Sequence, residues 1–378
     1  MSNRKKLNIA LLAPLVSPIA QPFIGGAQAM LHDMTLELAR RGHKVTLFAA
    51  PGSKIEATHP ADAALARQIT LAEVPVKLGE LTPADFSKAD GYRENDEAFF
   101  RQTELFLQTY LRINRAIPAF DIAHAMAYDL PAFAFAPLSG VPTVHTLHIG
   151  ALDARINSIL RTTWIETGKS RATTVSNACA TTYAPYFEID RVIYNAIDTA
   201  AIPFGAKGEG FLLFAGRITP EKGLDLAIEI ARMAGKKLVI AGGIYDSGFY
   251  ESKIRSQLES DQNLQYVGQL HRANLFALMS RADGVLFTSR WEEPFGLVLA
   301  ESMAAGTPVI AWDKGAAPEI ITHAETGFLL PYEDVAAAEA AVKRLNEIDR
   351  AHCRLYIEKK FSWSRIIAEY EDYYYSML

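Results

Sequence analysis

The chain has 378 residues, of which 49% are hydrophobic and 21% are charged. These proportions are typical of globular proteins and exclude a disordered or coiled-coil chain, and the length predicts two domains of roughly 150 residues each. The net charge of −5 excludes the basic excess that nucleic-acid-binding proteins carry. The two cysteines, Cys179 and Cys353, form neither a disulfide framework nor a metal-binding pattern, so we expect no metal site and a reducing, cytoplasmic location.

The N-terminal segment has two interpretations. Arg4-Lys5-Lys6 followed by the apolar residues 7–19 is typical of a signal peptide. The alternative is a buried strand over residues 7–13, and Asn8, which interrupts the apolar run, favours this strand. No run of about 20 apolar residues occurs in the chain, so we expect no membrane-spanning segment.

Apolar segments then alternate with segments of helical periodicity. After Gly25-Gly26, apolar residues recur at helical spacing as far as Leu38, and Gly42 is a stop signal for that helix. The strands predicted in this half of the chain are 7–13, 45–49, 122–125, 142–147 and 172–175. Such an alternation indicates a parallel sheet covered by helices on both faces.

The segment 196–210 interrupts this alternation with one proline and three glycines, and we interpret it as a linker. The pattern then restarts, with strands predicted at 211–214, 237–241, 266–267, 285–288 and 309–312 and helices at 224–233, 274–280 and 297–305. The sequence therefore predicts an α/β protein with two Rossmann-like, doubly wound parallel-sheet domains, residues 1–198 and 199–361, facing each other across a cleft. Residues 362–378 are expected to form a final helix that packs back on the first domain.

The common nucleotide-binding fingerprints are missing from the sequence. No G-x-G-x-x-G follows a predicted strand, and the chain contains no P-loop motif. Hydride transfer is therefore a weak interpretation.

The densest chemical signal is the loop 289–296, which joins a predicted strand to a helix. A helix N-terminus offers backbone N–H groups to a phosphate. Glu293 precedes the helix and Glu301 lies inside it, and two carboxylates beside a phosphate site suit a ligand rich in hydroxyl groups. Taken alone, these residues also fit a solvated loop with a surface glutamate.

A second signal lies at the end of the strand 211–214. Its loop carries Arg217 and Lys222 directly before a helix. Two cations at a strand end could neutralise a diphosphate leaving group without a metal ion. Taken alone, this loop also fits a solvated turn.

Together and in this order, the two signals resemble the retaining glycosyltransferases of sequence family four, which have the GT-B architecture. The resemblance runs nearly end to end. Besides Gly25-Gly26, it covers the segments 142–148, 175–177, 192–198, 216–223, 293–301, 306–310 and 326–328.

The resemblance implies roles for individual residues. Arg217 and Lys222 would hold the donor's diphosphate, Glu293 the hydroxyl groups of the donor sugar, and Glu301 the ribose. The implied donor-binding set is Gly25, Gly26, Arg217, Lys222, Glu293, Pro294, Phe295, Gly296, Leu297, Val298 and Glu301, and the implied catalytic set is Arg217, Lys222, Glu293, His148 and His124.

The acceptor side departs from the family pattern at one position. His148 and His124 would line this side, but family members often carry a second histidine two residues after the first, where this chain has Met126. His124 also has a plainer interpretation, as a hydrogen-bonded histidine at the end of a buried strand.

The predicted function is transfer of a hexose from a nucleotide-diphosphate sugar, UDP-glucose first, to a hydroxyl of a small-molecule, glycan or lipid acceptor. The resemblance implies retention of configuration and independence of metal, and the chain contains no Asp-x-Asp pair. The nucleotide sugar is a co-substrate, and no cofactor is expected. The alternatives are a GDP-mannose-dependent mannosyltransferase, a nucleotide-sugar 2-epimerase of the same architecture, and a non-catalytic carbohydrate-binding protein.

Two segments would allow peripheral membrane contact with a lipid acceptor. They are Arg4-Lys5-Lys6 and the aromatic segment 99–110. In the alternative interpretation, which we favour, Phe99, Leu105, Phe106 and Tyr110 form the buried face of a helix.

Overall fold

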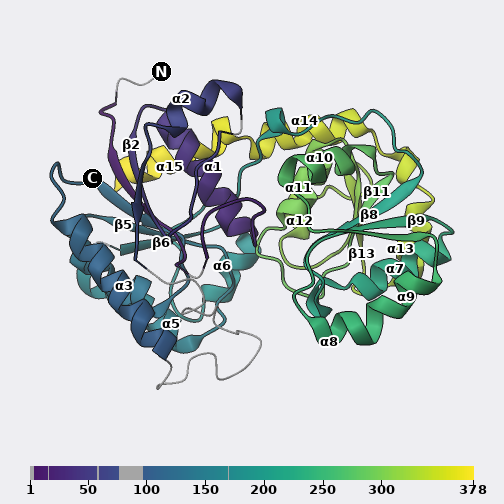
Figure 1. The fold of residues 1–378 in the computed structure, drawn as a ribbon, viewed down its shortest axis with the longest axis horizontal. Coiled ribbons are helices and arrows are strands. Elements are labelled where there is room, and N and C mark those ends of the chain that lie inside the picture. The colour runs from purple at the N-terminus through teal and green to yellow at the C-terminus, as the bar shows by residue number, and fades with distance from the viewer. Residues whose placement is uncertain (1–3, 16, 58, 76–96, 169) are drawn as a thin grey trace. The chain divides into compact units, whose positions relative to one another are not determined.

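The computed structural model describes residues 4–15, 17–57, 59–75, 97–168 and 170–378. The chain forms two compact units (Figure 1). Unit 1 comprises Met1–Tyr194 and Ile366–Leu378, and unit 2 comprises Asn195–Arg365. The sequence-based boundaries, after residues 198 and 361, each lie four residues from those of the structure.

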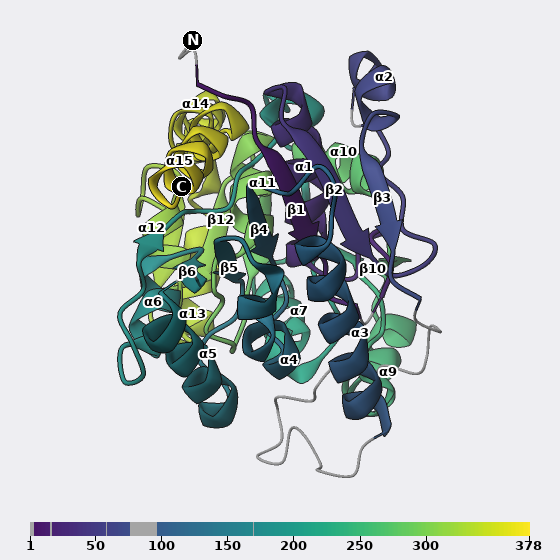
Figure 2. The same ribbon diagram turned by 90° about the vertical axis from the view of Figure 1, so that its left-hand side faces the viewer.

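Unit 1 is built on a parallel sheet whose strands, as far as the structure describes them, follow the order β3-β2-β1-β4-β5-β6-β7. Figure 2 shows the strands from β3 to β6 following one another across the unit. Their bounds are β1 Asn8–Leu12, β2 Lys44–Ala49, β3 Thr70–Glu73, β4 Ile122–Ala125, β5 Thr143–Leu147, β6 Ser170–Thr174 and β7 Arg191–Val192. The central position of β1 confirms the strand interpretation of the first apolar run.

The helices of unit 1 connect these strands and return to them from the C-terminus. They are α1 Gly26–Arg40, α2 Ala63–Ala66, α3 Glu97–Asn114, α4 Leu130–Ala134, α5 Ala154–Thr167, α6 Asn177–Tyr183 and α15 Trp363–Ser376. Asp153 starts α5 by accepting a hydrogen bond from the amide of Arg155 at 2.8 Å.

The strands of unit 1 place alternate side chains on the two faces of the sheet. On one face, Ala123 and Ala125 of β4 join an apolar core with Phe106 and Tyr110 of α3. Leu105, Phe106 and Tyr110 are buried, which fits the buried-face interpretation of this helix, while the side chain of Phe99 lies outside the described residues.

His124 lies between Ala123 and Ala125 and therefore points to the opposite face, where helix α15 packs. Its Nδ1 lies 2.6 Å from the hydroxyl of Tyr374, and its Nε2 lies 2.7 Å from Oγ1 of Thr146. Tyr374 is fully buried. The final helix thus packs back on the N-terminal sheet, and Figure 1 shows α15, in yellow, among the purple and blue elements of unit 1.

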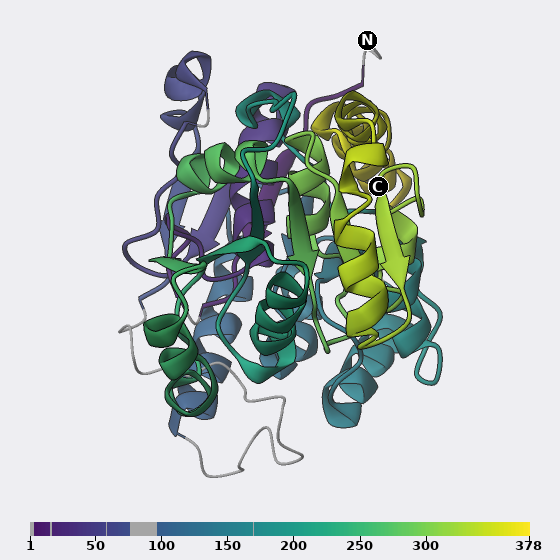
Figure 3. The ribbon, with the colours of Figure 1, turned by 90° about the vertical axis from the view of Figure 1, so that its right-hand side faces the viewer.

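Unit 2 contains a second parallel sheet, with the order β10-β9-β8-β11-β12-β13. Figure 3 shows this sheet and the helices against it. The strands are β8 Phe211–Ala215, β9 Lys237–Ala241, β10 Leu264–Gly268, β11 Gly284–Phe287, β12 Val309–Trp312 and β13 Gly327–Leu330. The helices are α7 Leu224–Met233, α8 Ser247–Phe249, α9 Arg255–Ser260, α10 Arg272–Arg281, α11 Leu297–Ala304, α12 Ala317–Ile320, α13 Val335–Val342 and α14 Arg350–Phe361.

The segment that the sequence suggested as a linker, residues 196–210, is bonded to unit 2 along its length. Arg354 donates to the carbonyl of Thr199 at 2.6 Å, and Arg350 donates to the carbonyl of Gly205 at 2.6 Å. A Cβ on Gly205 would lie 1.7 Å from the carbonyl oxygen of Ser280, so the close packing here requires glycine.

The predicted α/β class with two doubly wound parallel sheets is confirmed. The sequence analysis missed β3, β7 and β13. Strand β3 is half-exposed and β7 has two residues, so neither has a long apolar run. Within the described ranges, no helix is long and apolar enough to span a bilayer.

The bond between Tyr374 and His124 leads to a stability prediction. Substituting Tyr374→Phe removes the hydroxyl partner of a fully buried imidazole nitrogen, and an unsatisfied buried polar group costs about 1–3 kcal/mol. We expect the free energy of unfolding, measured in urea, to fall by that amount. In the matched control Tyr375→Phe the lost bond is an exposed one to the carbonyl of Lys5, so the change should be smaller. Equal losses in the two variants would contradict the assigned role.

Candidate functional site

The candidate site lies where the strand order of the unit 2 sheet reverses. Strands β8 and β11 are neighbours at the centre of the sheet, although helices and two strands separate them in sequence. Ligands of open α/β sheets bind at the carboxyl ends of such strands. The loop 216–223 follows β8, and the loop 288–296 follows β11, so the two loops predicted to carry the chemistry meet at this point.

Lys222 and Glu293 form an ion pair across the two loops. Lys222 ends the 3-10 turn η4 (Pro220–Lys222), and its Nζ contacts Oε1 of Glu293. The same carboxylate oxygen accepts a hydrogen bond from Oγ of Ser289 at 2.9 Å. The side chains of Lys222 and Glu293 are 19% and 11% exposed, so water screens the pair less than it screens a surface pair.

A side-chain hydrogen bond to the backbone and a close backbone approach hold the two loops at this separation. The hydroxyl of Thr288 donates to the carbonyl of Gly223 at 2.8 Å. Gly223 has φ +70°, and a Cβ there would lie 2.1 Å from the carbonyl oxygen of Thr288. A glycine is therefore required directly after Lys222.

A third loop, which follows β12, supports the Glu293 segment. The amide of Ala316 donates to the carbonyl of Glu293 at 3.0 Å. Gly315 has φ +57°, and a Cβ there would lie 2.7 Å from the Glu293 amide nitrogen. The sequence analysis selected neither Gly315 nor Ser289 as a site residue. A glycine just after a predicted strand was the available signal for Gly315.

Arg217 presents its cation at the same edge of the sheet. Its side chain is 47% exposed, and its Nη2 lies 3.9 Å from Oε1 of Glu221, at the outer limit of an ion pair. The guanidinium also lies over the ring of Tyr245, 5.7 Å from the centroid. A cation so weakly paired can bind an anionic ligand without first giving up a strong partner.

The start of helix α11 provides the predicted helix N-terminus. Gly296 has φ +84° and caps the helix, and the buried Phe295 packs edge-on against Phe361 at 5.6 Å. The first turn, with Leu297 and Val298, leaves N–H groups that have no acceptor within the helix. These amides and the helix dipole favour a phosphate at this end. Pro294, half-buried, connects this turn to Glu293.

Glu301 lies on α11 and is 6% exposed. Its Oε1 lies 3.7 Å from Nη2 of Arg272, a side chain of the neighbouring helix α10. The structure thus places Glu301 in a buried ion pair rather than on the surface. Its predicted contact with a ribose stays a prediction.

The remaining predicted residues belong to unit 1. Gly25 is the N-cap of α1, with Gly26 as the first helical residue, and their part in donor binding stays a prediction. His148 follows β5, and its Nε2 is buried without a partner among the described residues. Both ring nitrogens of His124 are occupied, so the structure agrees with the plainer interpretation of a hydrogen-bonded histidine. Met126, the departure from the family pattern, is 3% exposed.

Three histidines of unit 1 have strongly lowered pKa values because burial disfavours the charged imidazolium. Burial lowers the pKa of His145 to about 3 and that of His148 to about 4. For His124, burial first, and then the nearby His148 and His145, lower the pKa to about 3. All three are therefore neutral in the folded protein at pH 7.

These pKa shifts predict a loss of stability in acid. Between the ordinary histidine pKa of 6.5 and about 4, the unfolded chain binds more protons than the folded chain, so the free energy of unfolding falls as the pH falls. Each histidine contributes a slope of about 1.4 kcal/mol per pH unit. In urea titrations between pH 6 and 4.5, the free energy of unfolding of His145→Leu should depend on pH less steeply than that of the wild type, by one such slope. Equal slopes for His145→Leu and wild type would show that the prediction is wrong.

Among the described residues, the structure contains no group of three or more His, Cys, Asp or Glu side chains arranged to hold a metal ion. The cationic side chains in the loops at the carboxyl ends of the unit 2 strands include those of Arg217, Lys222, Arg290 and Lys314.

Two family models match adjoining parts of the chain. The model described as "Glycosyltransferase Family 4" matches residues 24–201, and the model described as "Glycosyl transferases group 1" matches residues 200–360. Among curated proteins, a glycogen synthase of Mycobacterium tuberculosis is 28% identical over 352 residues, which cover 85% of this chain and 82% of that protein. A D-inositol 3-phosphate glycosyltransferase of Jonesia denitrificans is 26% identical and covers 96% of this chain and 95% of that protein.

Solved structures share the fold over nearly the whole chain. A sucrose-phosphate synthase from Thermosynechococcus elongatus has a TM-score of 0.76 at 17% identity, covering 98% of this chain and 99% of that one. The Anabaena protein HepE in complex with UDP has a TM-score of 0.71 at 16% identity, covering 98% of this chain and all (100%) of that one. HepE in complex with UDP-glucose has a TM-score of 0.68 at 18% identity, with the same coverage.

Proposed function

The chain belongs to glycosyltransferase family four and has the GT-B fold, and from this premise we propose that it transfers a hexose from a UDP-sugar, UDP-glucose first, to an acceptor hydroxyl with retention of configuration. We also propose that the reaction needs no metal ion. The acceptor is a small molecule, a glycan or a lipid. A cytoplasmic location stays part of the proposal.

The observation that carries the proposal is the Lys222–Glu293 pair at the reversal point of the unit 2 sheet. A cation that can bind a diphosphate lies directly beside a carboxylate that can bind sugar hydroxyls, and helix α11 begins at Leu297, four residues after that carboxylate. A nucleotide sugar contains the two groups that such a site can bind, a diphosphate and a sugar rich in hydroxyl groups, and one bond joins them.

The site residues suit the charge that develops during transfer. The bond between the anomeric carbon and the diphosphate oxygen breaks, and the acceptor oxygen bonds to the anomeric carbon through an oxocarbenium-like transition state. The acceptor's proton goes to the departing phosphate. Arg217, Lys222 and the amides of the first turn of α11 stabilise the growing negative charge more in the transition state than in the substrate, and this difference accelerates the reaction.

Glu293 fits the sugar side of the bond. Its Oε1 is occupied by Lys222 and Ser289, which fix the orientation of the carboxylate. The carboxylate has further lone pairs for sugar hydroxyl groups. A UDP donor is supported by the fold neighbour HepE, whose solved structures contain UDP and UDP-glucose.

The first functional prediction concerns the ion pair. Lys222→Ala and Glu293→Gln should each lower kcat/KM for the donor by about 10²–10³-fold, the cost of losing one preorganised charge partner. Steady-state transfer assays measure this loss. The matched control is Lys236→Ala. Lys236 lies just before strand β9 and forms a similar lysine–carboxylate pair, with Asp283, so this variant should transfer at the wild-type rate. Wild-type turnover by both site variants would rule out the donor-site assignment.

The second functional prediction concerns the donor. Isothermal titration calorimetry should show binding of UDP in preference to GDP and ADP, and an assay with UDP-glucose should release UDP only when an acceptor is present. Preferential binding of GDP would favour the mannosyltransferase alternative. Epimerisation of the sugar without any acceptor would favour the 2-epimerase, and binding without release of nucleotide in any acceptor screen would favour a carbohydrate-binding protein.

A further inference from the structure

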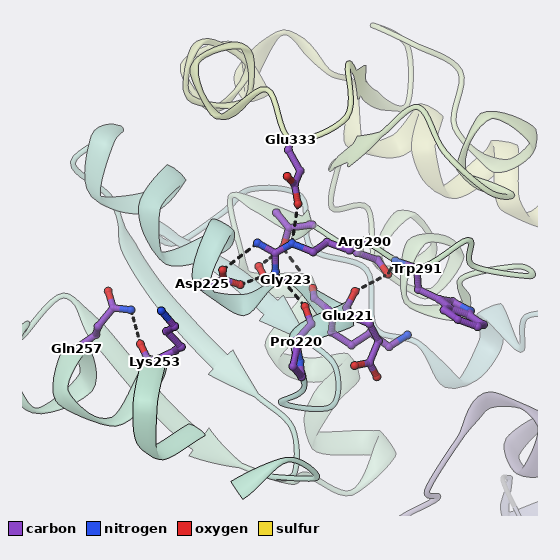
Figure 4. Close-up of polar contacts among 12 residues, drawn as sticks. Pro220, Glu221, Gly223, Asp225, Lys253, Gln257, Arg290, Trp291 and Glu333 are labelled. Atoms are coloured by element: carbon purple, nitrogen blue, oxygen red, sulfur yellow. Dashed lines mark hydrogen bonds and ion pairs between the residues drawn. The ribbon is translucent and has the colours of Figure 1, made fainter. Parts of the chain in front are cut away.

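Arg290 lies between Ser289 and Glu293 in the loop after β11, and its guanidinium contacts three other segments of unit 2 (Figure 4). Nη1 and Nη2 donate to the two carboxylate oxygens of Asp225 at 2.8 and 2.9 Å. Nη1 also donates to the carbonyl of Pro220 at 2.9 Å, and Nε donates to the carboxylate of Glu333 at 2.6 Å. Three groups, from the loop after β8, the first turn of α7 and the segment before α13, therefore meet at one side chain.

The main chain of Arg290 adds two more contacts. Its amide donates to the carbonyl of Glu221 at 2.7 Å, and its carbonyl accepts a hydrogen bond from Nζ of Lys314 at 2.7 Å. The residue thus also binds the loop after β12, which supports Glu293.

The contacts bracket Lys222 in the sequence. Pro220 and Glu221 precede Lys222, whereas Asp225 follows it in the first turn of α7. Arg290 therefore holds the segment on both sides of the lysine. Glu293 follows Arg290 by three residues on the other loop, so Arg290 links the segment that carries the ammonium to the loop that carries the carboxylate.

The contact with Glu333 is backed by an independent feature of the backbone. Glu333 has φ +58°, the left-handed region that residues with a Cβ rarely occupy. Such a conformation persists only where its surroundings hold it. The bond from Arg290 holds the carboxylate of Glu333, and the amide of Val335 holds its carbonyl at 2.9 Å.

The arrangement requires an arginine rather than any cation. A guanidinium is planar and presents several donors in a fixed fork, whereas an ammonium is a point charge. Arg290 uses this fork for Asp225 and the remaining donor directions for Pro220 and Glu333. The side chains of Arg290 and Asp225 are 28% and 32% exposed, so the pair lies partly out of water.

We propose that Arg290 is a positioning residue for glycosyl transfer, which holds Lys222 and Glu293 in the geometry that binds the donor. Arg290 acts through these two side chains and does not itself touch the substrate. The inference rests on the proposed function, because it assigns Arg290 to the site that the proposed function uses.

The test is a double-mutant cycle between Arg290→Lys and Lys222→Ala. Arg290→Lys keeps the charge but loses the fork, and a displacement of about 1 Å at a reacting site can cost about 10²-fold. We expect that loss in kcat/KM for UDP-glucose in the wild-type background. In the Lys222→Ala background the same substitution should cost less than about tenfold, because only its effect through Glu293 remains and residues that act through one another are not additive.

Two further variants keep the test decisive. Asp225→Asn removes the bidentate partner while leaving the guanidinium in place, and it should show the same dependence on Lys222 if Arg290→Lys fails to fold. Arg255→Lys is the matched control: Arg255 also pairs with two carboxylates, those of Glu251 and Glu259 at 2.9 and 3.1 Å, but on the exposed surface around α9. It should transfer at the wild-type rate. Thermal unfolding of each variant establishes that it is folded.

The outcomes separate the inference from the proposed function. Two results would overturn the inference: fully additive losses, as a purely structural role would give, or wild-type kcat/KM in folded Arg290→Lys and Asp225→Asn. In either case the proposed function would still stand if the wild-type protein transfers the sugar from UDP-glucose. Absence of transfer by the wild-type protein with every donor and acceptor tried would overturn the proposed function, and the inference with it.

Discussion

The close approach of two loops at the centre of the unit 2 sheet is the constraint on which the candidate site depends. Lys222 reaches Glu293 because Gly223 brings its backbone against the carbonyl of Thr288, at a distance that a Cβ would not allow. Gly315 permits an equally close approach on the far side of Glu293. These two glycines thus fix the position of a cation and a carboxylate, and the polar side chains around them, including that of Arg290, keep the loops from separating.

In unit 1 the alternation of the strand decides what each histidine can do. The two faces of the sheet pack against different partners. The face that carries His124 packs against α15, and the hydroxyl of Tyr374 on that helix satisfies one imidazole nitrogen of His124. His145, on the next strand, packs edge-on against Phe133 with a ring-centroid distance of 5.0 Å. Burial keeps both histidines neutral, so neither adds charge to the core. His148 lies beyond the end of β5, at the edge where ligands of parallel sheets bind.

The sequence predicted those features that depend on neighbours along the chain. Apolar runs located the central strands, and the positions of Lys222 and Glu293 followed because both lie just after such strands. Contacts between segments far apart in the chain could not be predicted from the sequence. The hydroxyl that binds His124 comes from Tyr374, 250 residues away, and no local pattern distinguishes a bonded histidine from a ligand-binding one. Arg290 lies in the loop 289–296 that the sequence analysis selected, but its partners Asp225 and Glu333 lie 65 and 43 residues away, so its role depends on the folded arrangement.

The pairing of Lys222 with Glu293 also bears on how a site of this kind could favour the transition state. A buried lysine without a partner would pay a large desolvation cost, and the carboxylate offsets it while holding the ammonium in place. The partner also weakens the attraction of the ammonium for a diphosphate that is still bonded to the sugar. As the anomeric bond breaks, the charge on the leaving oxygen grows and competes more strongly for the same ammonium. A cation already held by a carboxylate therefore gains most of its interaction late in the reaction, which is the differential stabilisation that catalysis requires.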